Sequence, residues 1–367
     1  MHIAMIGTRG VPARYGGFET AIEEIGKRLV AGGHQVTVYC RNSFGGDVMW
    51  RDVHGMRCVP LPAARHRALE TLSHSAVSSL HAAAISRPDV AFVFNAANAP
   101  FVRLLQAFGI RCALHTDGLE WQRGKWGPIG RRYYLLSERF GAMHADLIIS
   151  DAEEISRYYA VRYNRPSEVI SYGAELISPP ASIVASMGLT PGEYYLAVAR
   201  LEPENHVDVI VDGYGQTSST RPLVVVGSTP YPRDYQNRLL ATAAMDSRVA
   251  MLGSIWDERI DALYAHTAMY LHGHSVGGTN PSLLRAMGAG APVGAWDVVF
   301  NRQVTQAPSR CFFDRPQGVA RLIEDCETDP SFWAANGAAG RKRVDMHYRW
   351  DDVAAAYERV ADKLAAL

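Results

Sequence analysis

Apolar and polar positions alternate along this chain in short stretches typical of strands, separated by stretches with helical spacing. The first strand is expected over residues 1–7 and the second over 35–40. Between them, apolar residues recur three and four positions apart up to about residue 31, which is the period of one helix face. The residues on that face are Phe18, Ala21, Ile22, Ile25 and Leu29. A strand–helix–strand unit of this kind predicts a parallel sheet.

The same alternation continues through both halves of the chain. Further strands are expected over residues 56–61, 90–94, 111–115, 145–150 and 169–174, and then over 194–199, 223–226, 249–253, 268–272 and 291–295. Helices are expected over residues 68–86, 131–143 and 350–367, with another from Pro281. Two prolines in the segment 177–180 indicate a linker. The pattern predicts an α/β protein of two doubly wound domains, 1–176 and 177–349, with a cleft between them.

Composition narrows the classes of protein that are possible. The 367 residues suffice for two domains, and 48% of them are hydrophobic. A formal net charge of zero does not suggest a general nucleic-acid binder, although residues 41–140 carry an excess of Lys and Arg. The five cysteines are scattered, which indicates neither a disulfide framework nor a metal site. Because no apolar run is long enough to span a bilayer, a cytoplasmic protein is expected.

The segment HSVGGTNPSLL, residues 274–284, carries the most specific signal. Gly277 and Gly278 let a ligand approach backbone N–H groups closely. Asn280 suits the N-cap of the helix that follows, and Pro281 suits its first turn. A helix N-terminus with free N–H donors is a site for a phosphate. An ordinary loop-to-helix junction would have the same sequence features.

The loop after the first strand, residues 8–20, is also rich in glycine. Its glycines do not follow the G-x-G-x-x-G spacing of dinucleotide-binding folds, which disfavours a dehydrogenase.

Polar residues that follow strands are the other candidates for chemistry. Arg200 could clamp a diphosphate, or it could form a surface ion pair with Glu202 or Glu204. Gly227 and Gly253 could line a slot for a base, although plain turns would look the same.

The segment HTDGLEW, residues 115–121, ends a strand in the first half of the chain. Asp117 or Glu120 could orient or deprotonate an acceptor hydroxyl, whereas the alternative for Asp117 is a turn or cap residue. Nearby, the helix over residues 131–143 carries Arg131, Arg132 and Arg139 among apolar residues. It could lie on an anionic membrane leaflet, but an ordinary amphipathic core helix is the favoured interpretation.

Six motifs resemble, in order, the rhamnosyltransferase-like branch of family 4 glycosyltransferases. They are GTRGVPARYGGFET, NAANAP, DGLEW, ARLEPEN, HGHSVGGTNPSLL and FNRQV. The resemblance implies a GT-B fold whose last helix, about 350–367, packs back on the first domain. It also implies retaining, metal-independent transfer from a nucleotide-diphosphate sugar, often dTDP-L-rhamnose, to an acceptor that is often a lipid-linked saccharide in cell-surface polysaccharide synthesis. No cofactor or nucleic acid is implied, and the enzyme would work at the inner face of the cell membrane.

Carried over by position, the resemblance assigns residues to three roles. Catalysis falls to Asp117, Glu120 and Arg200. Donor binding falls to Gly16, Gly17, Arg200, Asn205, Gly227, Gly253, Ile255, His274, Gly277, Gly278, Thr279, Asn280 and Arg285. The acceptor side falls to Arg14, Tyr15, His115 and Trp121.

The sequence departs from the wider family at three of these positions. Gly277 and Arg285 stand where many family 4 enzymes carry glutamates, and Asn205 stands where they carry a lysine. Arg285 could add a cation near the phosphates instead. Two alternatives therefore stay open beside the glycosyltransferase: a nucleotide-sugar epimerase, and a non-catalytic protein that binds nucleotide-sugars.

Overall fold

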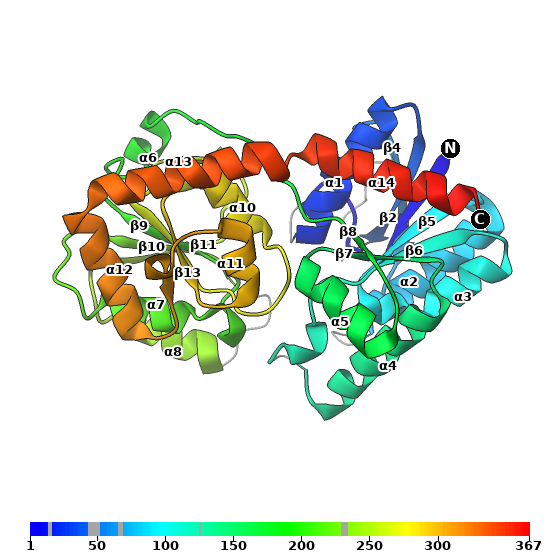
Figure 1. Cartoon of the computed structure of the whole chain (residues 1–367), viewed down its shortest axis with the longest axis horizontal. Coiled ribbons are helices and arrows are strands. Elements are labelled where there is room, and N and C mark those ends of the chain that lie inside the picture. Colours follow the sequence, from blue (N-terminus) through cyan, green and yellow to red (C-terminus); the bar gives the residue numbers. More distant parts are fainter. Residues whose placement is uncertain (14–16, 43–51, 65–68, 125, 229–233) are drawn as a thin grey trace. The chain divides into compact units, whose positions relative to one another are not determined.

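Two compact α/β units make up the protein (Figure 1). The computed structural model describes residues 1–13, 17–42, 52–64, 69–124, 126–228 and 234–367. The first unit comprises Met1–Tyr172 and Trp350–Leu367, and the second comprises Gly173–Arg349. Each contains one predominantly parallel sheet, so the prediction of an α/β protein with two doubly wound sheets is confirmed.

The first sheet has the strand order β3-β4-β2-β1-β5-β6-β7-β8. All its pairs are parallel except the β3–β4 hairpin. Every residue of β5 is buried, as expected for a central strand covered on both faces. The strands are β1 (His2–Ile6), β2 (Gln35–Asn42), β3 (Asp52–Val53), β4 (Met56–Pro62), β5 (Val90–Phe94), β6 (Arg111–His115), β7 (Leu147–Ser150) and β8 (Glu168–Val169).

The helices of the first unit include the last helix of the chain. They are α1 (Gly17–Ala31), α2 (Glu70–His81), α3 (Pro100–Ala107), α4 (Pro128–His144), α5 (Glu153–Tyr163) and α14 (Trp350–Ala365), with short turns η1 (Ala82–Ser86), η2 (Ala96–Asn98) and η3 (Glu120–Gln122). Arg28 of α1 bonds Asp351 of α14 at 2.7 Å. The Tyr357 ring lies edge-on to Phe92, with 5.0 Å between their centroids. These contacts tie α14 to the first unit.

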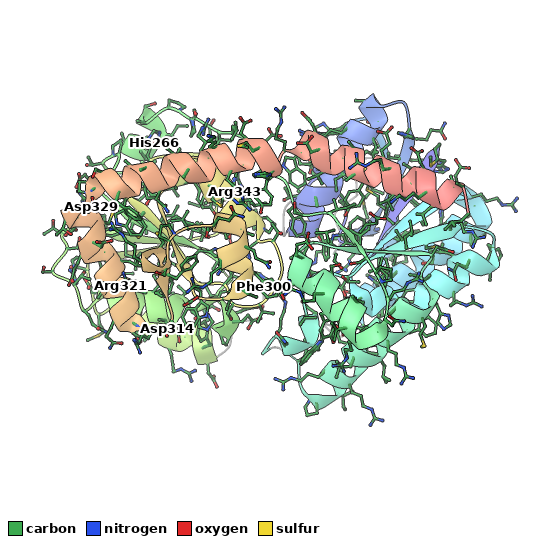
Figure 2. The ribbon with its side chains drawn as sticks, viewed as in Figure 1. His266, Phe300, Asp314, Arg321, Asp329 and Arg343 are labelled. Carbon is green, nitrogen blue, oxygen red and sulfur yellow. The ribbon has the colours of Figure 1, made fainter. Side chains whose placement is uncertain are left out.

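The second sheet is parallel throughout, in the order β11-β10-β9-β12-β13-β14. Its strands are β9 (Tyr195–Val198), β10 (Leu223–Val226), β11 (Val249–Gly253), β12 (Met269–His272), β13 (Val293–Trp296) and β14 (Phe312–Phe313). Its helices are α6 (Ser182–Ser186), α7 (Val207–Tyr214), α8 (Asp234–Ala243), α9 (Glu258–Ala265), α10 (Pro281–Gly288), α11 (Val299–Thr305), α12 (Pro316–Thr328) and α13 (Pro330–His347), with turns η4 (Pro203–Asn205) and η5 (Ser309–Cys311). Arg343 of α13 donates to the Val304 carbonyl at 2.6 Å and so anchors the end of α11 (Figure 2).

One predicted strand is mostly wrong. The apolar segment 169–174 was expected to pair throughout, but β8 stops at Val169. The Ile170 N–H still donates to the Ser150 carbonyl at 2.9 Å, after which the chain leaves the sheet edge. Ala174 then forms an isolated bridge with Arg349 inside the second unit. Burial of Ile170, Tyr172 and Ala174 explains these apolar residues without strand pairing.

The packing of α4 against α5 buries a carboxyl group. Glu138 is 1% exposed and accepts hydrogen bonds from the Tyr158 hydroxyl at 3.0 Å and the Tyr163 hydroxyl at 3.4 Å. Burial outweighs these bonds and raises the pKa of Glu138 from 4.5 to about 7. The folded protein therefore holds a proton here that the unfolded chain releases near its ordinary pKa.

The raised pKa of Glu138 should affect how the free energy of unfolding depends on pH. Because the folded pKa is the higher one, its stabilising effect is complete below pH 4.5 and is lost as pH rises to about 7. We expect Glu138→Gln to flatten the pH dependence of the unfolding free energy over that window by at most about 3 kcal/mol. Urea titrations at several pH values, with Glu153→Gln on the exposed side of α5 as control, test this. Equal pH dependence in wild type and Glu138→Gln would contradict it.

Candidate functional site

Several loops of the second unit meet at the carboxyl edge of its sheet. In open parallel sheets this edge is where ligands bind. The loops after β9 and β12 are joined there, since these strands are neighbours. Ser275 donates to the Glu204 carbonyl from both its N–H and its hydroxyl, each at 3.0 Å. His206 Nδ1 bonds the Gly273 carbonyl at 2.8 Å, and the His206 ring stacks on Trp296 with centroids 3.5 Å apart.

The start of α10 is capped as the sequence predicts. Asn280 Oδ1 accepts from the Ser282 N–H at 3.0 Å and from the Ser282 hydroxyl at 2.8 Å. Since both of these Ser282 groups donate, the Asn280 oxygen must face them and the Nδ2 amino group faces away. Nδ2 has no partner among the described residues. The helix therefore begins with a fixed amide donor beside its positive dipole end.

Behind this cap lies a buried polar chain that the sequence analysis missed. The Tyr270 hydroxyl is 3.0 Å from Ser282 Oγ and 3.0 Å from His272 Nδ1. His272 is completely buried, which lowers its pKa to about 3 and keeps the imidazole neutral. When His272 carries its proton on Nδ1, it donates to the Tyr270 hydroxyl, and that hydroxyl donates to Ser282 Oγ. The Ser282 hydroxyl in turn donates to Asn280 Oδ1. This series of hydrogen bonds fixes the Asn280 cap from the core. The sequence signal for it was a histidine inside the otherwise apolar strand β12.

The loop before α10 has the geometry that its glycines suggest. Gly277 has φ +138°, a left-handed conformation that favours glycine, and open space beside it. Gly278 and Thr279 are buried. The His274 ring stacks on His272 at 4.5 Å, and the His274 carbonyl accepts from Asn301 Nδ2 at 3.0 Å.

Arg200, directly after β9, is a cation without a counter-charge. Its side chain is partly buried, and no described residue forms a hydrogen bond or ion pair with its guanidinium. The predicted alternative of an ion pair with Glu202 or Glu204 is therefore wrong for this structure. An unpaired arginine at the same sheet edge as a capped helix N-terminus can bind an anion.

Two other predicted donor-binding residues are engaged with the protein itself. Asn205 is 1% exposed, and its Nδ2 donates to the Arg200 carbonyl at 2.8 Å, which closes the loop on itself. Arg285 is exposed and pairs with Asp261 of α9 at 2.6 Å between Nε and Oδ1. The charge of Arg285 is therefore partly neutralised.

The ends of β10 and β11 lie at the same edge. A Cβ on Gly227 would stand 1.8 Å from the Ala199 carbonyl, so the loop after β9 requires glycine there. Ser228 and Ser254 share a hydrogen bond of 2.6 Å between their hydroxyls. Gly253 has open space beside it, and Ile255 is 9% exposed. This part of the edge is bounded by small residues.

In the first unit, the carboxyl end of β6 brings the predicted acidic residues to the sheet edge. Asp117 has φ +59°, a left-handed backbone that is rare for residues other than glycine, asparagine and aspartate. Its N–H donates to His115 Nδ1 at 3.3 Å. Such strained positions concentrate at functional sites, although a turn residue would share the conformation.

His115 supports this turn from inside. It is 2% exposed among the rings of Phe18 and Phe94, at 5.3 and 5.5 Å between centroids. Burial lowers its pKa to about 3, so the ring stays neutral. It therefore positions Asp117 from below instead of reaching the surface.

Glu120 and Trp121 occupy the turn η3. The Glu120 carboxylate is 5% exposed, pairs with Arg123 and accepts from Trp126 Nε1 at 3.4 Å. This pairing partly neutralises the Glu120 carboxylate. The indole N–H of Trp121 has no acceptor in the described part of the chain. Gly17 opens α1, whereas Arg14, Tyr15 and Gly16 lie outside the described residues.

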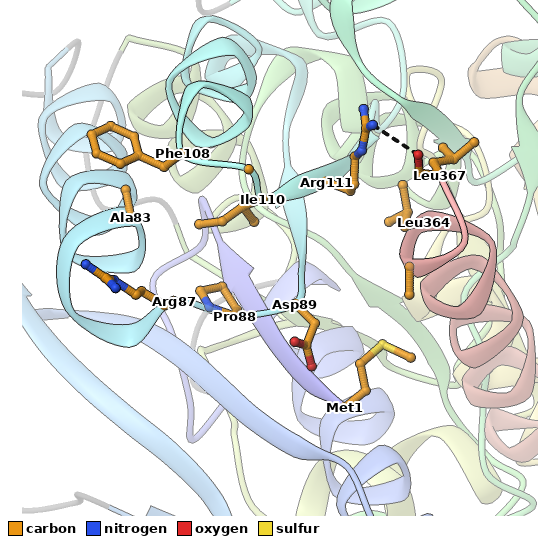
Figure 3. A pocket seen from close by; sticks show the side chains of 12 residues that line it. Met1, Ala83, Arg87, Pro88, Asp89, Phe108, Ile110, Arg111, Leu364 and Leu367 are labelled. Carbon is orange, nitrogen blue, oxygen red and sulfur yellow. Dashed lines mark hydrogen bonds between the residues drawn. The ribbon is translucent and has the colours of Figure 1, made fainter.

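A separate pocket of about 750 Å³ lies at the opposite, amino edge of the first sheet (Figure 3). Its lining includes Asp89, Phe108 and Arg111, and Arg111 donates to the Leu367 carbonyl at 3.1 Å. None of the predicted site residues lines it.

Among the described residues, no three His, Cys, Asp or Glu side chains gather so that they could hold a metal ion. The same residues include no helix with the length and apolar character needed to cross a bilayer.

Comparisons with known proteins agree with this architecture. Residues 1–175 match a "Domain of unknown function (DUF1972)", and residues 211–359 match a family described as "Glycosyl transferase-like". A search of curated proteins finds no match.

Solved structures resemble the whole chain. Sucrose-phosphate synthase from Thermosynechococcus elongatus is 21% identical with a TM-score of 0.84, over 100% of this chain and 99% of that one. Anabaena Alr3699/HepE in complex with UDP-glucose is 14% identical with a TM-score of 0.79, over 100% and 99%. WaaG, a glycosyltransferase involved in lipopolysaccharide biosynthesis, is 16% identical with a TM-score of 0.74, over 99% of each chain.

The fold is therefore GT-B, as the sequence motifs implied. The second half of the chain is glycosyltransferase-like in sequence. Membership of a rhamnosyltransferase-like branch stays a prediction.

The Asn280 amide offers a test that separates capping from ligand binding. Asn280→Asp keeps the oxygen that accepts from Ser282, and aspartate caps helices as well as asparagine does. We expect thermal stability to be unchanged or slightly higher, while a nucleoside diphosphate binds about tenfold to a hundredfold more weakly, because a carboxylate oxygen replaces the Nδ2 donor.

Melting curves and calorimetric titration measure the two effects on the same samples. Asn280→Ser, which keeps a cap without adding charge, is the control and should weaken binding less. If Asn280→Asp binds the nucleoside diphosphate as tightly as wild type does, the Asn280 amide is not part of the binding site.

Proposed function

We propose that this protein is a glycosyltransferase that moves a sugar from a nucleotide-diphosphate donor to a saccharide or lipid-linked saccharide acceptor. The observation that carries the proposal is the unpaired Arg200 at the same sheet edge as the capped N-terminus of α10. The glycosyltransferase-like sequence of residues 211–359 supports it. So do similar structures, which include Alr3699/HepE in complex with UDP and with UDP-glucose.

The chemistry of the donor fits these groups. When a sugar leaves a nucleoside diphosphate, negative charge builds on the departing phosphate. Arg200 and the N–H donors of Gly278, Thr279 and Asn280 would stabilise that charge from fixed positions, which costs little reorganisation during the reaction. In this proposal the transfer needs no metal ion or other cofactor and retains the configuration of the sugar.

The first unit would hold the acceptor. Asp117 is the residue proposed to orient or deprotonate the acceptor hydroxyl, because it lies in a left-handed turn at the carboxyl end of β6. His115 and Trp121 would shape that side, together with Arg14 and Tyr15. The donor sugar would be a hexose such as L-rhamnose carried on dTDP. A lipid-linked acceptor of cell-surface polysaccharide would bring the enzyme to the inner face of the cell membrane.

Binding of UDP, dTDP and GDP measured by calorimetry tests the donor site. We expect one nucleotide to be preferred, and Arg200→Ala to weaken its binding about tenfold to a hundredfold, since a charge-assisted hydrogen bond is lost. Arg221→Ala is the matched control, because Arg221 lies at the amino edge of the same sheet and pairs with Glu193 at 2.8 Å. An equal loss of nucleotide affinity in both variants, or no loss in Arg200→Ala, would argue against a donor site at Arg200.

Asp117→Asn tests the acceptor side. Asparagine tolerates the left-handed backbone, so the turn should be retained. We expect sugar transfer to slow by roughly 10²- to 10⁴-fold while nucleotide affinity is unchanged. Transfer measured by release of the nucleoside diphosphate with a saccharide acceptor would show this. Wild-type turnover by Asp117→Asn would remove the residue from catalysis, and conversion of donor sugar without an acceptor would favour an epimerase.

A further inference from the structure

The pocket at the amino edge of the first sheet has the size of a small-molecule site. Its volume is about 750 Å³, and such sites commonly have about 300–1,000 Å³. Arg111, which lines it, begins β6, whereas Asp117 follows the end of that strand. Figure 3 shows Phe108, Ala83 and Arg87 on one side of the pocket and Arg111 on the other. The proposed transfer reaction gives this pocket no role.

One wall of the pocket has an unusual backbone. The turn η1 is a single turn of π-helix, in which the Arg87 N–H donates to the Ala82 carbonyl, five positions earlier, at 2.8 Å. Arg87 itself has φ +44° and ψ +60°, a left-handed conformation that helix ends usually give to glycine. Turns of π-helix and left-handed residues other than glycine both recur at functional sites. An arginine here bears a backbone cost that glycine would avoid.

Arg87 is also the unmatched charge of the lining. Its side chain is exposed, and its guanidinium has no hydrogen-bond or ion-pair partner in the part of the chain that the structure describes. The other charged side chains of the lining are engaged: Asp89 accepts from the His2 N–H at 2.7 Å, and Arg111 pairs with Asp146 at 2.9 Å. The charge left to be matched is therefore positive, which favours an anionic ligand.

Apolar side chains line the pocket together with this cation. Phe108 directly follows α3 and is 58% exposed, so its ring is available to a ligand. Ile110 lines the same pocket and is 3% exposed. Gly109, between them, has φ +81° and open space beside it, so no side chain at that position narrows the pocket. The lining thus combines an aromatic ring and an aliphatic side chain with an unpaired guanidinium.

We infer that this pocket is a second binding site, for a small aromatic phosphate or carboxylate. The anionic group would bind the Arg87 guanidinium, whose planar fork of donors matches the oxygens of both anions. The aromatic ring would pack against Phe108 and Ile110. The inference does not rest on the proposed function, because a ligand at the amino edge meets neither Asp117 nor Arg200.

Phenyl phosphate and benzoate test the site, with their binding to the full chain measured by saturation-transfer NMR of the ligand protons. Each combines a ring with an anion, and the tighter binder of the two identifies the anion that the pocket prefers. We expect inorganic phosphate to displace phenyl phosphate only at about tenfold higher concentration, because it has no ring to pack on Phe108.

Three variants locate the binding. Arg87→Asn should weaken it about tenfold to a hundredfold, since a charge-assisted hydrogen bond is lost while asparagine tolerates the left-handed backbone. Arg103→Asn is the matched control, because Arg103 is an exposed arginine of α3 outside the lining, and it should bind as wild type does. Phe108→Ala keeps every charge and should weaken binding about threefold to tenfold. Circular dichroism verifies that all three are folded.

Binding of neither probe by the wild type would overturn the inference. Equal binding by wild type and Arg87→Asn would overturn it as well. Because the start of α10 is also proposed to bind phosphate, the titrations are repeated on Arg200→Ala, which should bind both probes as wild type does. Loss of probe binding in Arg200→Ala, with binding kept in Arg87→Asn, would place the probes at the proposed donor site and contradict the second site.

Nucleoside diphosphate binding, measured on the same proteins, separates this inference from the proposed function. It should be unchanged in Arg87→Asn and Phe108→Ala. Absent probe binding with intact nucleotide binding would contradict the second site alone. Absent nucleotide binding with intact probe binding would contradict the proposed function alone.

Discussion

The capped start of α10 is the constraint on which the proposed donor site depends. Asn280 can cap the helix only with its oxygen turned inward, and Ser282, Tyr270 and His272 hold it there from the core. The buried imidazole stays neutral, so this orientation does not change with physiological pH. One consequence is that the Asn280 Nδ2 amino group is a fixed donor that faces away from the helix cap. The other is that, in the proposed function, Arg200 can bind the donor diphosphate without first breaking an ion pair.

Much of the fold could be predicted from local pattern. The β1–α1–β2 unit, the final amphipathic helix and the capping of α10 follow from spacing and from single residues such as Asn280 and Pro281. The segment after Val169 could not, because its apolar residues are buried where the chain leaves the sheet. Burial and strand pairing produce the same sequence pattern there.

The candidate site was predictable in position but not in contacts. Motifs and strand ends located Arg200, Asp117 and the glycines at carboxyl edges. Whether Arg200 would pair with a neighbouring glutamate depended on side-chain directions that sequence does not contain. The Arg285–Asp261 pair joins two helices across 24 positions and carries no local signal. The Glu120–Arg123 pair, at a spacing of three, and the histidine within β12 were signals that sequence could have supplied.

Hydrogen exchange of backbone amides, with and without a saturating nucleoside diphosphate, tests the central claim most directly. The account predicts slower exchange on binding in two separate segments, 200–206 and 277–282, because both border the carboxyl edge of the second sheet. The amino edges of both sheets should exchange as before. Protection confined to other segments, or no protection with any nucleoside diphosphate, would contradict a donor site built around the start of α10.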